Sequence, residues 1–177
     1  MSRIRELENV FWEACAKILP AVIDKPEKFI RWRHPTNGAP DWTVSDNVLF
    51  LNLMERDEAY AKQRHNVFLT GATGEVTKRS MRTRTWDLYC TAYGPDSCEI
   101  VNLLKDGFFL LEIKKILADS SIYLVPYLPS CMQMSEVFAG KWWERWDLTL
   151  TFNEEHFTSE DVGAVQKISF GFSANAK

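Results

Sequence analysis

The sequence predicts an α/β protein of the α+β type, in which a mostly antiparallel β-sheet is flanked by helices and one long β-hairpin projects from it. The main evidence is two strand-like runs, "TRTWDLYCTAYG" (residues 83–94) and "ERWDLTLTFN" (residues 144–153). Both contain Trp-Asp-Leu and both alternate bulky with polar side chains. Two other stretches have the apolar spacing of an amphipathic helix. Because 177 residues fit one domain, we expect a single domain over residues 1–177.

Composition and charge exclude several classes of protein. Hydrophobic residues make up 46% of the chain and charged residues 25%, which is ordinary for a globular protein and unlike a disordered or membrane-embedded one. The net charge of −3 argues against a dedicated nucleic-acid binder, which usually carries a basic domain or stripe. No apolar run approaches the roughly 18 residues that span a bilayer, and the charged N-terminus lacks a signal-peptide pattern, so we expect synthesis in the cytosol. For each of the seven Trp residues two interpretations stay open, a place in the core or in a contact surface.

The first third of the chain predicts a helix followed by two strands. The helix, over residues 2–19, has Ser2 as its cap and Pro20 at its end. Its apolar stripe consists of Ile4, Leu7, Val10, Phe11, Ala14 and Ile18. The run "KFIRWRHP" (residues 28–35) then predicts a strand, and the apolar run over residues 47–59 predicts a strand in the interior of the sheet.

The segment over residues 56–82 predicts a β-hairpin that projects from the sheet. Gly71 and Gly74 mark a turn between "NVFLT" and "EVTKRS". The segment is too long for an ordinary structureless loop in a compact domain, and most of its residues are charged or polar. We therefore expect it to protrude rather than to join the core.

The next elements are a strand, a long helix and a second strand. In the first strand, alternation places one set of side chains toward the core, and these are Arg84, Trp86, Leu88, Cys90 and Ala92. Residues 93–121 then predict one continuous helix, with Pro95 in its first turn and Asp96 or Ser97 as its cap. The expected apolar stripe of this helix is Ile100, Leu103, Leu104, Phe108, Leu111 and Ile116. We expect Trp86 and Trp146 to be buried on the same sheet face beneath this helix, which would explain the repeated Trp-Asp-Leu.

The chain ends with a segment that predicts a docking strand over residues 164–172. A polar stretch over residues 153–163 separates it from the sheet and would act as a tether. Alternation gives one apolar side made of Ile168, Phe170 and Phe172, and such a side is unfavourable in water. The strand can add to its own sheet or to the exposed edge of a neighbour's sheet, and the sequence leaves both open.

No group of residues predicts catalysis, a cofactor or a metal ion. The three His residues are scattered, and "GATGEV" lacks the Lys and hydroxyl that a phosphate-binding loop needs. The four Cys residues show no CxxC spacing, so we expect free thiols. Asp87 and Asp147 could form a pair of carboxylates, but cross-strand ion pairs with arginines explain them more simply.

Basic residues are concentrated in and next to the expected hairpin, although the protein as a whole is acidic. They are Lys62, Arg64, Lys78, Arg79, Arg82 and Arg84. One interpretation is a solvated hairpin that keeps an edge soluble, and the other is a contact element for an acidic partner surface. We treat these residues, with Ile168, Phe170 and Phe172, as candidate contacts to other subunits or partners.

The order of elements and two of their motifs resemble the tail terminator, or neck, proteins of long-tailed bacteriophages. The shared motifs are a strand that leads into an aromatic-Gly turn before a helix, and an "E-R-x-D-L-x-L-x-F" strand, present here as residues 144–152. The resemblance extends over roughly residues 29–170. It implies a structural virion protein, without enzymatic activity or cofactor, that assembles in the host cytoplasm.

The resemblance also implies a set of partners. Copies of the protein would form a ring, a hexamer, that ends tail-tube polymerisation and joins the tail to the head-tail connector. The partners would be the tail-tube protein, the connector or neck protein, the sheath protein if the tail contracts, and genomic DNA that passes through the lumen without sequence-specific binding. The alternative from another class is a monomeric α+β adaptor or binding module without a virion role.

Overall fold

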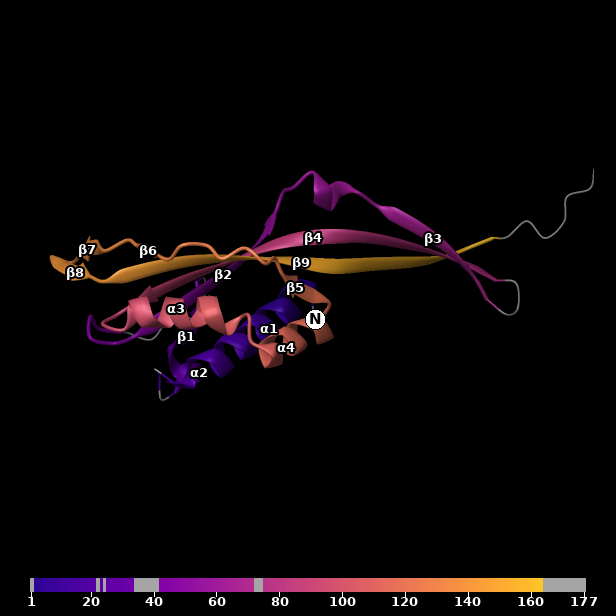
Figure 1. Ribbon diagram of the computed structural model, residues 1–177. Coiled ribbons are helices and arrows are strands. Elements are labelled where there is room, and N and C mark those ends of the chain that lie inside the picture. The colour runs from indigo at the N-terminus through magenta and orange to yellow at the C-terminus, as the bar shows by residue number, and fades with distance from the viewer. Residues whose placement is uncertain (1, 22, 24, 34–41, 72–74, 164–177) are drawn as a thin grey trace, which may run out of the picture.

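The computed structural model describes residues 2–21, 23, 25–33, 42–71 and 75–163, and it confirms the predicted α+β class (Figure 1). The strands are β1 (Ile30–Trp32), β2 (Val48–Arg56), β3 (His65–Thr70), β4 (Val76–Tyr93), β5 (Ile122–Leu124), β6 (Met132–Gln133), β7 (Glu136–Phe138), β8 (Lys141–Trp143) and β9 (Arg145–Val162). The helices are α1 (Arg3–Ile18), α2 (Pro26–Phe29), α3 (Ser97–Gly107) and α4 (Leu111–Asp119), with short 3-10 turns η1 (Leu19–Ala21) and η2 (Tyr60–Lys62).

The main sheet has the strand order β1-β2-β4-β9-β5, and in addition β3 pairs with β4 and β6 pairs with β9. Among these described strands, β1 and β2 form the only parallel pair. The helices lie against one face of this sheet.

The central pair of strands, β4 and β9, organises the sheet. Each has 18 residues, and they pair antiparallel over their full length, from Val76 opposite Val162 to Tyr93 opposite Arg145. Both Trp-Asp-Leu runs therefore belong to neighbouring strands of one antiparallel sheet, as predicted. The two motifs do not face each other, because Trp86 pairs with Phe152.

The core lies between the helices and one half of this strand pair. Alternate side chains of the two strands are buried, namely Trp86, Leu88, Cys90, Ala92, Leu148, Leu150 and Phe152. The ring of Phe152 packs edge-on against Phe11 of α1 at 4.7 Å and against Phe108 at 5.4 Å between ring centroids. Trp86 is buried as expected, whereas Trp146 is only half-buried at the rim of the core, which corrects the prediction of full burial.

The prediction of one helix over residues 93–121 is wrong, because the chain forms two helices with a break at residues 108–110. Phe109 and Leu110 donate their backbone N–H groups to Asp106 and Gly107 in tight turns, and the backbone of Leu110 is extended. Gly107, just before the break, lies in close contact with α1, since a Cβ there would lie 2.4 Å from Cγ2 of Ile18. The turn lets the buried ring of Phe108 reach the core and leaves Leu111 exposed instead of in the apolar stripe.

Three smaller predictions also need correction. The strand expected over residues 28–35 is the short helix α2 followed by β1, because Pro26 at the first helical turn favours a helix start there. Ser2 and Asp96 are the N-cap residues of their helices, as expected, but neither makes a capping hydrogen bond through its side chain. In the first helix, Ile4 is exposed rather than part of the buried stripe.

The expected hairpin is part of a three-stranded extension. β3 pairs with β4 from His65 opposite Met81 to Thr70 opposite Val76. On the other side of β4, β9 continues to Val162, so residues 153–162 form a strand and not the polar tether that the sequence suggested. Main-chain pairing with β4 holds this stretch in place, although it has no continuous apolar side. The expected strand over residues 164–172 lies outside the described residues.

Trp86→Ala should lower the free energy of unfolding by about 3–5 kcal/mol, the usual range for removing a large buried aromatic side chain. Trp86 is 4% exposed and also donates a hydrogen bond through Nε1 to Glu154 at 2.7 Å. Trp142→Ala is the matched control, because Trp142 is 72% exposed and its loss should leave the stability nearly unchanged. Urea denaturation of both variants checks this, and equal midpoints would contradict the placement of Trp86 in the core.

Candidate assembly surfaces

The most prominent surface feature is the extension, which we call the arm and define as β3, residues 76–84 of β4 and residues 155–162 of β9. It lies beyond the last pair of β2 with β4, Arg56 opposite Thr85, and beyond the helices (Figure 1). Nine residues of extended strand span about 30 Å. The arm is therefore long enough to reach well outside the body of its own domain.

The candidate basic residues lie on the arm or on the connection to it, but the structure does not bring them together as one patch. Since alternate residues of a strand point to opposite faces, Lys78, Arg82 and Arg84 share one face while Arg79 lies on the other. Lys62, on the connection, is exposed. Arg64 is also exposed, directly before β3.

Most of these basic residues already have partners within the subunit. Lys62 forms an ion pair with Asp57 at 2.8 Å, and Lys78 of β4 forms one with Glu160 on the neighbouring strand β9. The guanidinium of Arg79 lies 4.0 Å from the centre of the Phe157 ring.

In contrast, the described residues include no ion-pair partner for Arg64 or Arg82. The remaining candidates, Ile168, Phe170 and Phe172, lie outside the described residues.

The arm also exposes apolar side chains that sequence reasoning missed. Val67, Phe68 and Leu69 of β3 are exposed, and so are Met81 and Phe157 on the neighbouring strands. The uncharged run "NVFLT" was the available signal, because a solvated hairpin normally carries charges along an exposed strand. An exposed apolar strip on a projecting element is typical of a surface that contacts another protein.

The arm joins the body at a buried carboxylate, Glu154, which is 1% exposed. Arg3 donates to Oε1 through Nε at 2.7 Å, Trp86 donates to Oε2 through Nε1 at 2.7 Å, and Arg84 lies 4.0 Å away. Arg3 also donates to the carbonyl of Ser120 at 2.7 Å. This cluster fastens α1, the end of α4 and both long strands at the base of the arm. The sequence contained a signal for this cluster. The alternation that turns Trp146 to Phe152 inward also turns Glu154 inward, opposite Arg84.

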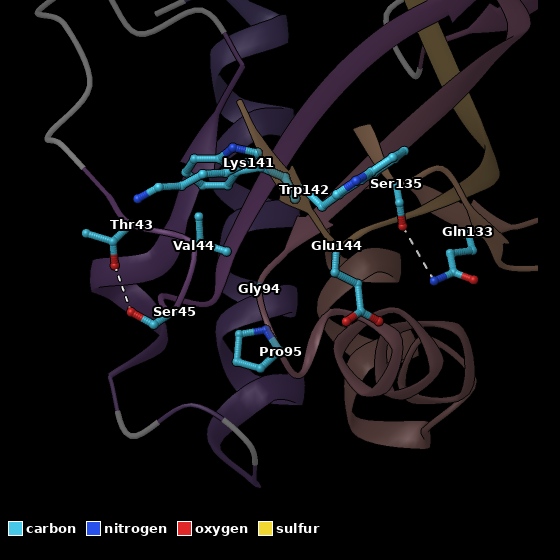
Figure 2. A pocket seen from close by; sticks show the side chains of 11 residues that line it. Thr43, Val44, Ser45, Gly94, Pro95, Gln133, Ser135, Lys141, Trp142 and Glu144 are labelled. Atoms are coloured by element: carbon cyan, nitrogen blue, oxygen red, sulfur yellow. Dashed lines mark hydrogen bonds between the residues drawn. The ribbon is translucent and has the colours of Figure 1, made fainter. Parts of the chain in front are cut away.

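A second surface lies at the other end of the molecule, on the β7–β8 hairpin (Figure 1). A shallow depression of about 820 Å³ there is lined by residues from three parts of the chain, and Figure 2 shows Trp142 and Lys141 on one side of it and Thr43 to Ser45 on the other. Two hydrogen bonds join polar side chains of the lining, between Thr43 and Ser45 at 2.9 Å and from Gln133 to Ser135 at 3.5 Å. Among the described residues that line the depression there is no His, and Glu144 provides one carboxylate.

Ion pairs and aromatic rings anchor this hairpin to the uncovered face of the sheet. Arg145 binds Asp147 at 2.7 Å and Glu136 at 3.2 Å. Tyr93 donates a hydrogen bond to Glu136 at 2.6 Å, and burial together with this bond raises the pKa of Tyr93 to about 12. Trp42 lies 4.6 Å from Trp143 between ring centroids.

The paired-carboxylate alternative for Asp87 and Asp147 does not hold. Asp87 binds Arg56 at 2.8 Å and accepts a hydrogen bond from Thr151 at 2.8 Å. Asp147 lies opposite Thr91, away from Asp87 along the strands, and binds Arg145. Both carboxylates therefore serve in ordinary ion pairs.

The described part of the chain contains no group of three or more His, Cys, Asp or Glu side chains placed to hold a metal ion. All four Cys residues are free thiols, with Cys15 and Cys90 buried. Among the described helices, none is long and apolar enough to cross a membrane.

An α+β domain with a projecting arm at one end and an aromatic hairpin at the other has the features of a structural assembly protein. The chain belongs to the phage neck terminator protein family, whose model matches residues 5–175, nearly its whole length. This match confirms the resemblance found in the sequence. The protein is thus a structural component of the phage tail and neck, and it contacts other tail and neck proteins of the virion. No curated protein matches the chain significantly.

Glu154→Gln should lower the free energy of unfolding by about 1.5–3 kcal/mol, because hydrogen bonds to a charged group contribute about that much. The neighbouring Glu155→Gln is the matched control, since Glu155 is exposed on the opposite face and its change should stay within about 0.5 kcal/mol. Urea denaturation measures both. If the two variants unfold at the same midpoint, Glu154 does not fasten the arm to the body.

Proposed function

We propose that the protein forms a closed ring, a hexamer, that caps the tail tube, ends its polymerisation and joins the tail to the head-tail connector. The observation that carries this proposal is the arm, which extends about 30 Å from the body with an exposed apolar strip. Such an element has no role in the fold of its own core. It suits a protein whose contacts lie in other subunits.

The arm itself offers two different surfaces, which supports a ring. A closed ring of identical subunits uses heterologous contacts, so each subunit needs two different surfaces that bind each other. The two outer edges of the arm differ in chemistry, because β3 exposes Val67, Phe68 and Leu69 whereas the outer part of β9 carries Glu155, Glu160 and Asp161. Surfaces left free after ring closure would bind the tail-tube protein on one side and the connector or neck protein on the other, and the sheath protein where the tail contracts.

Genomic DNA would pass through the lumen of this ring without sequence-specific binding. The net charge of −3 and the internal pairing of Lys62 and Lys78 leave little fixed positive charge to grip phosphates. A loose fit of this kind would allow DNA to move during packaging and ejection.

Removal of the arm should abolish assembly without unfolding the body. Arg56 and Thr85 are direct partners, so a two-residue Asn-Gly turn can replace residues 57–84, with the chain ended after Glu155. We expect the full chain to have the mass of a hexamer by light scattering and a ring shape by negative-stain imaging, and the shortened chain to be a folded monomer by circular dichroism and mass. A monomeric full chain would support the adaptor alternative instead.

The C-terminal segment, residues 164–172, should dock on a sheet edge through Ile168, Phe170 and Phe172. The segment follows Val162 at the tip of the arm, so edges of the subunit's own arm or of a neighbour are both acceptors. A chain ended after Val162 keeps the arm and should assemble more weakly than the full chain. Amide hydrogen exchange provides the second measurement, and rapid exchange throughout residues 164–172 in both assembled and dispersed protein would show that the segment does not dock.

A further inference from the structure

The arm has two outer edges, and the described residues include no strand that pairs with either. β3 pairs with β4 alone. On the other side, β5 covers β9 as far as Glu154, and the N–H of Glu155 still donates to the carbonyl of Ser121 at 3.1 Å. β6 covers β9 at Trp146 and Asp147, so the edge is open from His156 to Val162. Each open edge presents unpaired main-chain N–H and C=O groups.

The edge formed by β3 lacks the features that usually protect an exposed strand. Natural edge strands are blunted by charged side chains, Pro or bulges. The sequence of β3, "HNVFLT", contains no Lys, Arg, Asp, Glu or Pro, and Val67, Phe68 and Leu69 are 39%, 62% and 49% exposed. A strand with these properties is suited to receive another strand.

The edge formed by β9 has the opposite chemistry. Residues 155–162 include Glu155, Glu160 and Asp161 and no Lys or Arg. Like charges would oppose the pairing of two such edges with each other. The β3 edge instead offers Arg64 directly before the strand, and Arg64 has no ion-pair partner among the described residues. The acidic edge therefore complements the β3 edge of another copy.

We propose that β3 of one copy pairs with residues 156–162 of β9 in the next copy, so that the arms join edge to edge into one closed sheet. This inference rests on the ring proposed above and names the contact that closes it. β3 and β9 are both antiparallel to β4, so they run parallel to each other, and a rotation between copies brings them together as a parallel pair. Six copies with three arm strands each would supply about 18 strands, and barrels of 16–18 strands leave an open channel.

The strand register of the arm makes this contact testable by disulfide cross-linking. Val67 and Ser159 both pair with Arg79, so they lie at the same level on the same face, two strands apart. Two strand spacings amount to about 9.5 Å, whereas a disulfide requires Cα atoms within about 7 Å. A disulfide between these two positions can therefore form only between different copies.

The experiment uses the full chain with Cys98→Ser and Cys131→Ser, which leaves only the buried native thiols. Val67→Cys is combined in turn with Phe157→Cys, Ser159→Cys and Asp161→Cys, because a shift of two residues keeps the side chains on the same face. Under mild oxidation, at least one pair should give a ladder of covalent multimers on a non-reducing gel. Each single Cys variant should remain uncross-linked, and Leu69→Cys with Thr77→Cys, which are direct partners, should give a disulfide within one chain.

Four outcomes would overturn the inference. A covalent dimer from Val67→Cys alone would show that β3 pairs with β3. A disulfide within one chain between Ser159→Cys and Lys167→Cys would show that the C-terminal segment covers the β9 edge of its own subunit. Rings seen by light scattering without cross-linking of any of the three pairs would reject this contact but leave the ring, whereas a monomeric protein would reject the ring itself.

A charge placed on the β3 edge gives an independent test. Phe68→Lys adds the kind of side chain that blocks edge pairing, and Phe68 is exposed, so the subunit itself should fold normally. We expect this variant to be monomeric by light scattering. The matched control is Leu111→Lys, because Leu111 is 85% exposed and lies on α4, away from the arm. If Phe68→Lys assembles as well as Leu111→Lys does, β3 is not the edge that pairs.

Discussion

The antiparallel pairing of β4 with β9 is the interaction on which the rest of the structure depends. One register of 18 residue pairs positions both the body and the arm. In the body it turns Leu88 and Leu150 toward the helices, and in the arm it sets Lys78 opposite Glu160. A slip by one residue would move every one of these side chains to the opposite face, so the buried half of the ladder also holds the register of the exposed half.

The buried carboxylate of Glu154 marks the point where the ladder leaves the core. A carboxylate in an apolar interior is costly unless donors surround it, and here Arg3 and Trp86 both donate to it. Arg3 belongs to α1, so the first turn of the chain is tied to a strand about 150 residues later in the sequence. Beyond this point the strands have no helix behind them, and their side chains change from aliphatic to charged and mixed.

This division between body and arm suits a neck protein. The body has the closely packed core of an ordinary stable domain, in which the ring of Phe152 packs against both Phe11 and Phe108. The arm has main-chain pairing but no core of its own, and its exposed Val67 to Leu69 strand lacks edge protection. If the protein assembles through the arm as proposed, stability and assembly would depend on different residues, and an assembly contact could be altered without unfolding the subunit.

The sequence by itself determined the α+β class, the burial of Trp86 and membership of the neck terminator family. All three depend on strands with one buried face, because burial of one face makes apolar and polar residues alternate along the sequence. Only the tertiary structure decided that residues 153–162 are a strand, because their strand state comes from main-chain bonds to β4 and leaves no apolar pattern. The sequence also did not reveal the break in the helix after Gly107. The apolar spacing runs on through residues 100–116, and the contact of Gly107 with Ile18, from a helix almost 90 residues earlier, becomes visible only when the two helices are packed together.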